Sequence, residues 1–510
     1  MMKRIAFALF TALAATAAAV EFSGIFRDNM VLQRDRTLPV WGKAEAGEKV
    51  AVKLGDRELG TTAGADGKWR VDFPPRPASD RPLELTANTA SGSAKIRNIL
   101  TGDVYLCGGQ SNMEWWVANS AGAEEAVKNA ANPRIRLFFS DRAISETPQE
   151  SAKGRWYECN SETVPKFSAV GYFFGRELER ELKIPIGLIN VSRGASSIEA
   201  WMSNPALASL PEGRETLAWY AKETTDYDRK YLEFKQKLAE FNATYPSQQA
   251  FLDAQSEARK AGKPIPIKPF VPVGPEHPQC VSGLYNALIH PLMPFAVKGV
   301  IFYQGEANVD RAVQYVPLLR SMIADWRRGF ENPELIFAIV QIPNYGKTFA
   351  ECRENPWANL RAAQAEAVSG LEHAGLIVAI DLGDANDLHP KNKLPVGRRL
   401  AEHVLARYEG QSFVVDGPTV KNVTFADGAA TVEFDHAEGL QTTDGQTPRS
   451  FQLAGADGRY QWAEAKIEGT RVVVRSAKVP QPVKIRYAWE YSPRVNLVNS
   501  AKLPAMPFQK

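Results

Sequence analysis

A serine that follows a pair of glycines is the residue of this 510-residue chain that most clearly suggests chemistry. The apolar stretch 104–107 runs into Gly108 and Gly109, and Gln110 and Ser111 come next. Glycines allow a sharp turn from a strand into a helix. A side chain on such a turn lies at the carboxyl edge of the sheet, where open α/β folds bind ligands. We therefore predict that Ser111 is a nucleophile, and the alternative is a helix N-cap.

A serine nucleophile needs a general base, which is usually a histidine. His389 lies in a polar loop after an apolar segment at 376–380, the last predicted parallel strand, so the loop reaches the same sheet edge as Ser111. We predict His389 as the base and Asp387 as the residue that orients it, with Asp384 or a backbone carbonyl near residue 387 as alternatives. Sequence context places the remaining histidines in packing or loop positions: His277, His290, His373, His403 and His436.

Acyl transfer also needs hydrogen-bond donors for the oxyanion that forms on the substrate carbonyl. Two segments that follow predicted middle strands, 190–195 and 303–308, each contain a glycine and side-chain amides. The carboxyl ends of parallel strands meet at one edge of a sheet, so these donors are expected near Ser111. The candidates for oxyanion or substrate binding are Gly194, Gln304, Asn308, Gln110 and Glu306.

The elements that position these residues form an alternating pattern between about residues 99 and 410. Apolar segments that read as strands alternate with helical segments, which predicts a parallel sheet with helices on both faces. The predicted strands are 104–107, 186–191, 299–303, 335–341 and 376–380, and the predicted helices are 171–182, 313–327, 360–367 and 396–408.

The two ends of the chain have a different pattern, with short alternating strands separated by turn signals such as Asp427-Gly428. This pattern is typical of β-sandwich-like modules. The predicted organisation is an N-terminal β domain at 20–98, an α/β domain at 99–414 and a C-terminal β module at 415–510. A polar, helical insertion at about 205–270 interrupts the α/β domain and is either a lid or a solvated hairpin without a role.

Residues 1–19 have the features of a cleavable secretory signal: Lys3 and Arg4, an apolar stretch at 5–15 and small residues at 17–19. This predicts a periplasmic or secreted protein. No later segment reaches the ~18 continuous apolar residues of a membrane helix.

The formal net charge is +3, and removal of Lys3 and Arg4 leaves +1, which argues against a general nucleic-acid surface.

Cysteine and histidine spacing gives no indication of a metal site or of another cofactor. The four cysteines are too few for a disulfide scaffold, and none forms a Cys-x-x-Cys pair. Export would permit a disulfide, and the sequence does not select a pairing. Cys107 lies in an apolar strand and is predicted to be a buried free thiol.

In combination, these motifs resemble the sialate O-acetylesterase family, a branch of the SGNH-type serine esterases. The resemblance extends over nearly the whole chain after residue 19. It rests on Asp28-Asn29-Met30-Val31-Leu32-Gln33-Arg34, Gly109-Gln110-Ser111-Asn112-Met113, Ile198-Glu199-Ala200-Trp201, Ser282-Gly283-Leu284-Tyr285-Asn286, Lys298-Gly299-Val300-Ile301-Phe302-Tyr303-Gln304-Gly305-Glu306 and Asn386-Asp387-Leu388-His389-Pro390-Lys391-Asn392-Lys393.

The resemblance implies an α/β fold with an SGNH/flavodoxin-like parallel sheet and removal of acetyl groups from sugar hydroxyls. It also implies that Ser111 attacks, that His389 is the base, and that the Ser111 backbone, an N–H near Gly194 and the segment from Gln304 to Asn308 hold the oxyanion. Two positions depart from the pattern. The family often has Trp-Gly-Gly-Thr where this chain has Arg193-Gly194-Ala195-Ser196, and the superfamily tends to have aspartate at the position of Asn386.

Three functions fit this sequence. The first is a sialate O-acetylesterase, the second an acetylxylan or xyloglucan acetylesterase, and the third a carbohydrate-binding protein without activity. Sialate carries a carboxylate, for which Arg193 or Arg361 is a candidate partner.

We expect an acetylated carbohydrate as the partner, with no nucleic acid and no membrane, and the sequence leaves the oligomeric state open. Candidates to stack on a sugar, with core packing as the alternative, are Trp115, Trp116 and Tyr303.

Overall fold

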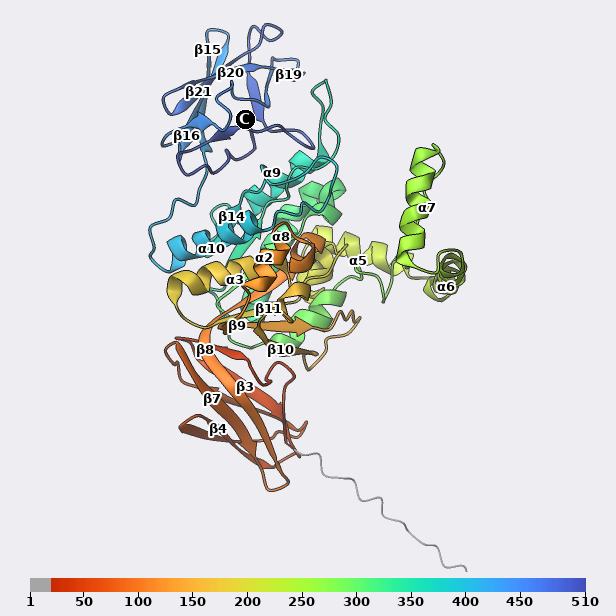
Figure 1. Cartoon of the computed structure of the whole chain (residues 1–510), viewed down its shortest axis with the longest axis vertical. Coiled ribbons are helices and arrows are strands. Elements are labelled where there is room, and N and C mark those ends of the chain that lie inside the picture. Colours follow the sequence, from red (N-terminus) through yellow and green to blue (C-terminus); the bar gives the residue numbers. More distant parts are fainter. Residues whose placement is uncertain (1–19) are drawn as a thin grey trace, which may run out of the picture.

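The computed structural model describes residues 20–510, and the predicted signal at 1–19 lies outside the described residues. Three parts follow one another along the long axis of the molecule (Figure 1). An N-terminal β region lies at one end, an α/β region in the middle and a C-terminal β region at the other end. The helices α6 (Tyr227–Thr244) and α7 (Gln248–Lys260) project from the side of the middle part.

A mixed sheet forms the centre of the α/β region, in the order β10-β9-β11-β8-β12-β13-β14. All neighbours in this order are parallel except β9 and β10. The strands are β8 (Ser93–Gly109), β9 (Asn132–Ser140), β10 (Gly154–Cys159), β11 (Ile186–Asn190), β12 (Gly299–Tyr303), β13 (Ile336–Val340) and β14 (Ala374–Ile377). After β8 the chain forms β9 and the edge strand β10 and returns to β11 beside β8 on one side, and it then crosses to β12, β13 and β14 on the other side. The carboxyl ends of β8 and β12 therefore flank a topological switch point, where such sheets bind ligands.

Helices cover both faces of this sheet. The helices α3 (Ala169–Leu182) and α10 (Leu394–Tyr408) share one apolar cluster with Ile301 and Tyr303 of β12. The helices α8 (Ala312–Gly329) and α9 (Pro356–Val368) share the other cluster with Val300 and Phe302. Alternate residues of one strand thus face opposite layers. The predicted α/β region with flanking β modules is confirmed, and the antiparallel β10 makes its sheet mixed.

The N-terminal β region shares β8 with the central sheet. The first half of β8 pairs with β7 (Ser79–Asn88) and with β2 (Val31–Gln33), whereas the second half pairs with β11 and β12. The predicted boundary at 98/99 therefore falls inside a single strand. The other strands are β1 (Glu21–Phe22), β3 (Leu38–Lys43), β4 (Lys49–Leu54), β5 (Arg57–Thr62) and β6 (Lys68–Phe73).

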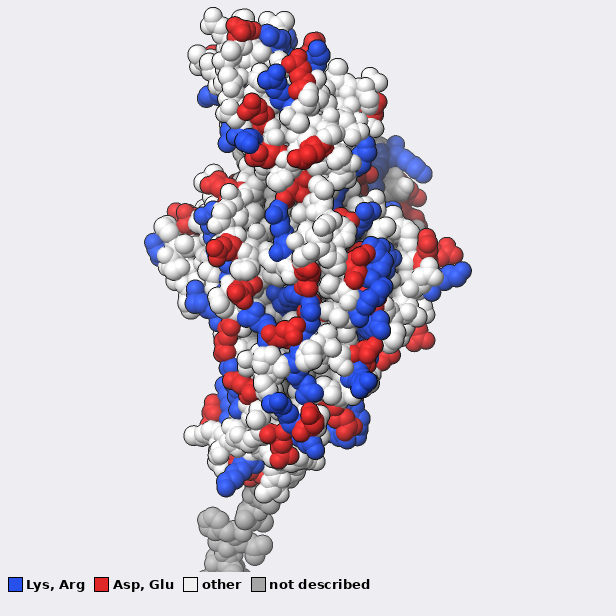
Figure 2. Space-filling model, turned by 90° about the vertical axis from the view of Figure 1, so that its left-hand side faces the viewer, with Lys and Arg blue, Asp and Glu red and all other residues white. Residues whose placement is uncertain are grey.

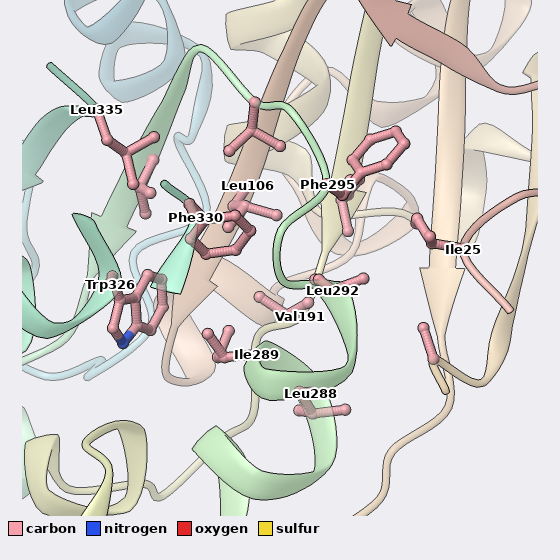
Figure 3. Packing of buried hydrophobic residues seen from close by; sticks show 14 of the residues in the cluster. Ile25, Leu106, Val191, Leu288, Ile289, Leu292, Phe295, Trp326, Phe330 and Leu335 are labelled. Atoms are coloured by element: carbon pink, nitrogen blue, oxygen red, sulfur yellow. The ribbon is translucent and has the colours of Figure 1, made fainter. Parts of the chain in front are cut away.

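An apolar cluster joins this β region to the α/β region. Figure 3 shows Ile25 of the N-terminal part close to Phe295, with Leu106 of β8 and Trp326 of α8 farther along the same cluster. The ring centroids of Phe26 and Phe295 are 5.7 Å apart. These contacts pack the N-terminal β region against the α/β region.

The C-terminal β region consists of antiparallel sheets around its own apolar cluster. Its strands are β15 (Thr419–Ala426), β16 (Ala429–Asp435), β17 (Gln441–Thr442), β18 (Phe451–Ala454), β19 (Gln461–Trp462), β20 (Glu464–Glu468), β21 (Arg471–Arg475), β22 (Lys484–Tyr487), β23 (Leu497–Val498) and β24 (Phe508–Gln509). Asp427 and Gly428 connect β15 to β16 with φ values of 50° and 68°, so the predicted hairpin turn is confirmed.

The helical insertion has an inner and an outer part. The inner helices α4 (Asn204–Ala208) and α5 (Pro211–Glu223) contact α8, whereas α6 and α7 contain no buried residue. The remaining short helices are α1 (Ser111–Glu114), α2 (Ala123–Lys128), η1 (Val117–Asn119), η2 (Val164–Lys166), η3 (Ile198–Trp201), η4 (Tyr285–Ile289), η5 (His290–Leu292) and η6 (Glu306–Arg311).

Acidic and basic side chains are intermingled over the face of the molecule that Figure 2 shows. Within residues 20–510, no helix is both long enough and apolar enough to cross a bilayer. All four cysteines are free thiols, and Cys107 is buried as predicted.

Candidate active site

The turn between β8 and α1 places Ser111 at the carboxyl edge of the central sheet. Gly109 has a φ of 122°, and a Cβ at this position would lie 2.2 Å from the carbonyl oxygen of Tyr303, so no other residue fits without a shift. The next amide, that of Gln110, donates to the same carbonyl at 2.9 Å. Gln110 is the N-cap of α1, which leaves the Ser111 hydroxyl free of a capping role.

The structure brings Ser111 and His389 into direct contact. The Nε2 atom of His389 lies 2.8 Å from the Oγ atom of Ser111. The Trp115 ring stacks on the imidazole, with centroids 5.3 Å apart and an interplanar angle of 19°. The nucleophile and the base therefore come from loops after β8 and β14, and an aromatic side chain fixes the plane of the base.

The two predicted acidic partners of His389 both accept hydrogen bonds from the main chain. Oδ1 of Asp387 accepts from the backbone N–H of His389 at 2.9 Å, and Oδ1 of Asp384 accepts from the backbone N–H of Asn386 at 2.8 Å. Across residues 20–510, the Nδ1 atom of His389 forms no hydrogen bond with another protein group. In this structure, Asp387 thus holds the loop that carries the imidazole.

The surroundings of His389 favour its neutral form. Burial lowers its pKa, and the positive charge of Lys393 lowers it further, while the carboxylate of Asp387 opposes both effects. A neutral imidazole can accept the proton of Ser111, so the electrostatics suit a general base.

Gly194 lies beside the nucleophile, and its N–H has a partner. A Cβ at Gly194 would lie 3.5 Å from the Cβ atom of Ser111, whereas the Gly194 N–H donates to Oε2 of Glu114 at 2.5 Å. Glu114 also forms an ion pair with Arg142. The following residue, Ala195, has a φ of 61°, which is a conformation that glycine adopts more easily.

The predicted residues Gln304 and Asn308 are buried and bond to other protein groups. Nε2 of Gln304 donates to Oδ1 of Asn308 at 2.8 Å and to the Ser196 carbonyl at 3.1 Å. Oε1 of Gln304 accepts from the Tyr315 hydroxyl at 2.8 Å, and Nδ2 of Asn308 donates to Glu199 at 3.1 Å. These two amides support the loops around the site.

Gln110 has one side-chain donor that no protein group uses. Its Oε1 atom accepts from the backbone N–H groups of Gly305 and Ala307, both at 3.3 Å, and from Nε2 of Gln304 at 3.2 Å. Backbone donors fix the orientation of the amide, because they cannot act as acceptors. The Nε2 group of Gln110 has no acceptor within the described part of the chain.

A buried polar network behind the site includes two residues that the sequence reasoning missed, Asn112 and Lys393. Nδ2 of Asn112 donates to Oε1 of Glu306 at 2.6 Å and to the Leu388 carbonyl at 3.1 Å, and Oδ1 of Asn112 accepts from Nζ of Lys393. Burial raises the pKa of Glu306 and lowers that of Lys393 to about 7. Both residues stand in motifs that carry the family resemblance, since Asn112 follows Ser111 and Lys393 comes four residues after His389.

Of the two arginine candidates, Arg193 is half-buried and has a side-chain nitrogen that is unpaired in the described chain. The Nε atom of Arg193 is buried without a partner among residues 20–510. Arg361 is fully buried and donates to the carbonyls of Ala488 and Glu490, so its predicted contact with substrate is wrong. Burial lowers the pKa of both guanidinium groups.

The three aromatic candidates have different environments. Tyr303 is buried, so its predicted stacking on a sugar is wrong, whereas Trp115 stacks on His389 and Trp116 is 41% exposed. Within the described residues, no cluster of three or more His, Cys, Asp or Glu side chains has a geometry that could hold a metal ion.

Comparison with known proteins shows the family of this chain. Residues 101–231 and 267–406 match the family of carbohydrate esterases described as sialic acid-specific acetylesterase. The sialate O-acetylesterase of Rattus norvegicus is 27% identical, over 96% of this chain and 93% of that protein, and the human sialate O-acetylesterase is 24% identical, over 96% and 92%.

A solved structure is also similar over nearly its whole length. The crystal structure of a carbohydrate acetylesterase from Xanthomonas citri is 33% identical, and the match covers 96% of this chain and 99% of that chain with a TM-score of 0.80. This chain is therefore a carboxylic ester hydrolase that belongs to the sialic acid-specific acetylesterase family of carbohydrate esterases.

Proposed function

We propose that this enzyme removes O-acetyl groups from sugar hydroxyls through an acetyl-enzyme intermediate on Ser111, in the manner of a sialate O-acetylesterase. The contact of 2.8 Å between Ser111 Oγ and His389 Nε2 carries the proposal, in a chain that belongs to an acetylesterase family. We also assign the α/β region to the SGNH type, because β11-β8-β12-β13-β14 has the strand order 2-1-3-4-5 of flavodoxin-like sheets once β9 and β10 are set aside.

The reaction has two steps. His389 Nε2 takes the proton of the Ser111 hydroxyl while Oγ attacks the acetyl carbonyl, and the tetrahedral intermediate collapses as the sugar oxygen leaves with that proton. A water molecule then attacks the acetyl-enzyme with His389 again as the base, and acetate leaves from Ser111. The neutral form of His389, which burial and Lys393 favour, is the form that both steps require.

The developing oxyanion needs N–H donors at the turn. We propose the Ser111 backbone N–H as one donor and the Gly194 N–H as a second, which becomes available when the Glu114 carboxylate gives way to the substrate oxygen. Nε2 of Gln110 is a further donor for the substrate. Gln304, Asn308 and Glu306 support the loops around these donors, since their side chains bond to other protein groups.

Asp387 is proposed as a positioning residue. Its bond to the His389 backbone fixes the loop, and its negative charge stabilises the imidazolium that forms during each step. This arrangement stands in place of the ring-to-carboxylate bond of a usual triad.

The substrate is proposed to be an acetylated sialic acid, and an acetylated plant polysaccharide such as xylan or xyloglucan is the second candidate. Arg193 supports the first candidate, because it is next to Gly194 and its Nε atom has no partner in the described chain. A planar guanidinium suits the carboxylate of sialate. We further propose export to the periplasm or the medium, on the basis of the signal-like sequence at 1–19.

Acetate release from acetylated sialic acids and from acetylated xylan tests the function and ranks the substrates. The wild type should release acetate from at least one of them, and failure on every acetylated carbohydrate would refute the function. If sialate is the substrate, Arg193→Ala should lower kcat/KM for the sialate ester by roughly tenfold or more and leave a neutral xylan ester nearly unchanged. Equal effects on both esters would remove the argument for sialate.

A further inference from the structure

A cavity of about 410 Å³ lies between the inner insertion helix α5 and the short helices η3 and η6. The indole of Trp219 lines it from α5 and is 44% exposed, which is unusual for so large an apolar side chain. Gln279 and Gln314 line the same cavity, and although Nε2 of Gln314 already donates to Glu215 at 3.2 Å, each amide nitrogen keeps a second N–H that can donate to a hydroxyl group. An exposed aromatic face with amides around it is the composition of a site for a polyhydroxylated ligand.

Two contacts connect this cavity to the nucleophile. Gln279, which lines the cavity, donates to the carbonyl of Ala195 at 3.3 Å, and Ala195 follows the glycine beside Ser111. Ala307, which also lines it, donates its N–H to Gln110 at 3.3 Å, and Gln110 precedes Ser111. The cavity therefore borders the loops on two sides of the nucleophile.

The charges in the cavity disfavour an anionic ligand. Three carboxylates line it, those of Glu199, Glu215 and Asp310, against the single guanidinium of Arg311. Nη1 of Arg311 already pairs with Glu199 at 2.5 Å, and Glu199 also accepts from Asn308. A sugar that carries a carboxylate would meet net negative charge here, whereas carboxylates readily accept hydrogen bonds from neutral hydroxyl groups.

We propose that this cavity is a subsite for a neutral sugar unit, which is linked to the acetylated sugar and stacks on Trp219. The inference rests on the proposed function, because it takes the acetylated sugar to lie at Ser111. It gives α5 a role in substrate recognition and leaves α6 and α7, which have no buried residues, outside that role.

Binding to the inactive Ser111→Ala protein tests the subsite apart from catalysis. The probes are xylotetraose, cellotetraose and lactose, with N-acetylneuraminic acid as the charged comparison, measured by calorimetry. At least one neutral probe should bind, and any binding of the acid should not depend on Trp219, because its proposed partner is Arg193 in the site at Ser111. Trp219→Ala should weaken that binding about tenfold, and Trp219→Phe should weaken it less. Absence of binding by all three neutral probes, or unchanged binding in Trp219→Ala, would overturn the proposal.

Kinetics of the otherwise wild-type enzyme give the second readout. Trp219→Ala should raise KM for acetylated oligosaccharides and leave kcat/KM for 4-nitrophenyl acetate unchanged, because the small ester does not reach the subsite. Phe270→Ala is the matched control, since Phe270 is an exposed aromatic side chain that does not line the cavity. An equal loss on both substrates in Trp219→Ala would overturn the subsite, whereas the binding result holds even if Ser111 were not the nucleophile.

Discussion

At the scale of single residues, the site depends on the balance of charge around His389. Lys393 lies behind the imidazole and lowers its pKa, and Asp387 raises it. Lys393 is itself held among Asn112 and the rings of Trp115 and Tyr303, with Nζ 5.9 and 5.7 Å from the two ring centroids. Below its own pKa of about 7, Lys393 is a buried cation beside the base, and it lowers the pH at which the imidazole becomes protonated.

Removal of the Lys393 charge and removal of the Asp387 charge should shift the pKa of His389 in opposite directions. In the wild type, the acidic limb of kcat/KM should report a pKa below 6.5, because the imidazole must be neutral to act. Lys393→Met removes a repulsive positive charge and should raise this pKa by roughly half a unit to one unit. Asp387→Asn should lower it and reduce kcat by about ten- to a hundredfold, less than the ~10⁴ loss known for a triad carboxylate.

Asp384→Asn is the control for this pair, since its carboxylate bonds only to the turn, and it should stay near the wild type. The pH profiles of kcat/KM could instead have the same acidic limb in Lys393→Met, in Asp387→Asn and in the wild type. That result would show that neither charge acts on His389. A loss of about 10⁴ in Asp387→Asn would show a carboxylate–imidazole bond during turnover.

At the scale of elements, the position of Ser111 depends on the turn between β8 and α1. Gly109 adopts a positive φ in this turn, and its backbone packs against the backbone of Tyr303 at the end of β12. Gly109→Ala should lower kcat by at least about a hundredfold, because a displacement near 1 Å is enough for such a loss. Gly122→Ala is the control, because Gly122 also has a positive φ, of 73°, but has open space around it. Full activity of Gly109→Ala on 4-nitrophenyl acetate would contradict this role of the turn.

Much of this arrangement could be predicted from the sequence, because strand ends carry local signals. The apolar run at 299–303 coincides with β12, and the glycines at 108 and 109 mark the end of β8. The alternating pattern of the first half of β8 matches a sheet with one exposed face, so the sequence predicts a separate domain there, whereas the structure continues the same strand into the central sheet. The strand β9 was missed, since it begins with Asn132 and Pro133 and contains two arginines.

Contacts between distant segments could not be predicted. The bond from Gly194 to Glu114 joins residues 80 positions apart, and that from Lys393 to Asn112 joins residues 281 apart. No local pattern in the sequence encodes such pairs. The sequence does not select the partner of His389 for the same reason, because the direction of a loop carboxylate depends on the fold of the whole loop.

At the scale of the whole molecule, Arg361 joins the α/β region to the C-terminal β region. From α9 it donates to the carbonyls of Ala488, Glu490 and Tyr491 at 2.8 to 3.2 Å. Arg361→Met should destabilise the protein by roughly 2–4 kcal/mol, because it leaves the carbonyls of Ala488 and Glu490 without a donor, whereas that of Tyr491 still accepts from the Tyr345 N–H. Thermal unfolding checks this, with Arg320→Met as the control, since Arg320 also donates to carbonyls but is exposed. Unchanged unfolding with a selective loss on sialate esters would instead return Arg361 to the substrate site.

The acetyl-enzyme is the most direct test of the central claim, that Ser111 is the nucleophile of an acetylesterase. Rapid quenching of the enzyme with 4-nitrophenyl acetate, followed by peptide mass spectrometry, should find one acetyl group on Ser111. Ser111→Ala should form no such adduct, should lose several orders of magnitude in kcat, and should unfold at the same temperature as the wild type. An acetyl group on another residue, or full activity in Ser111→Ala, would contradict the account.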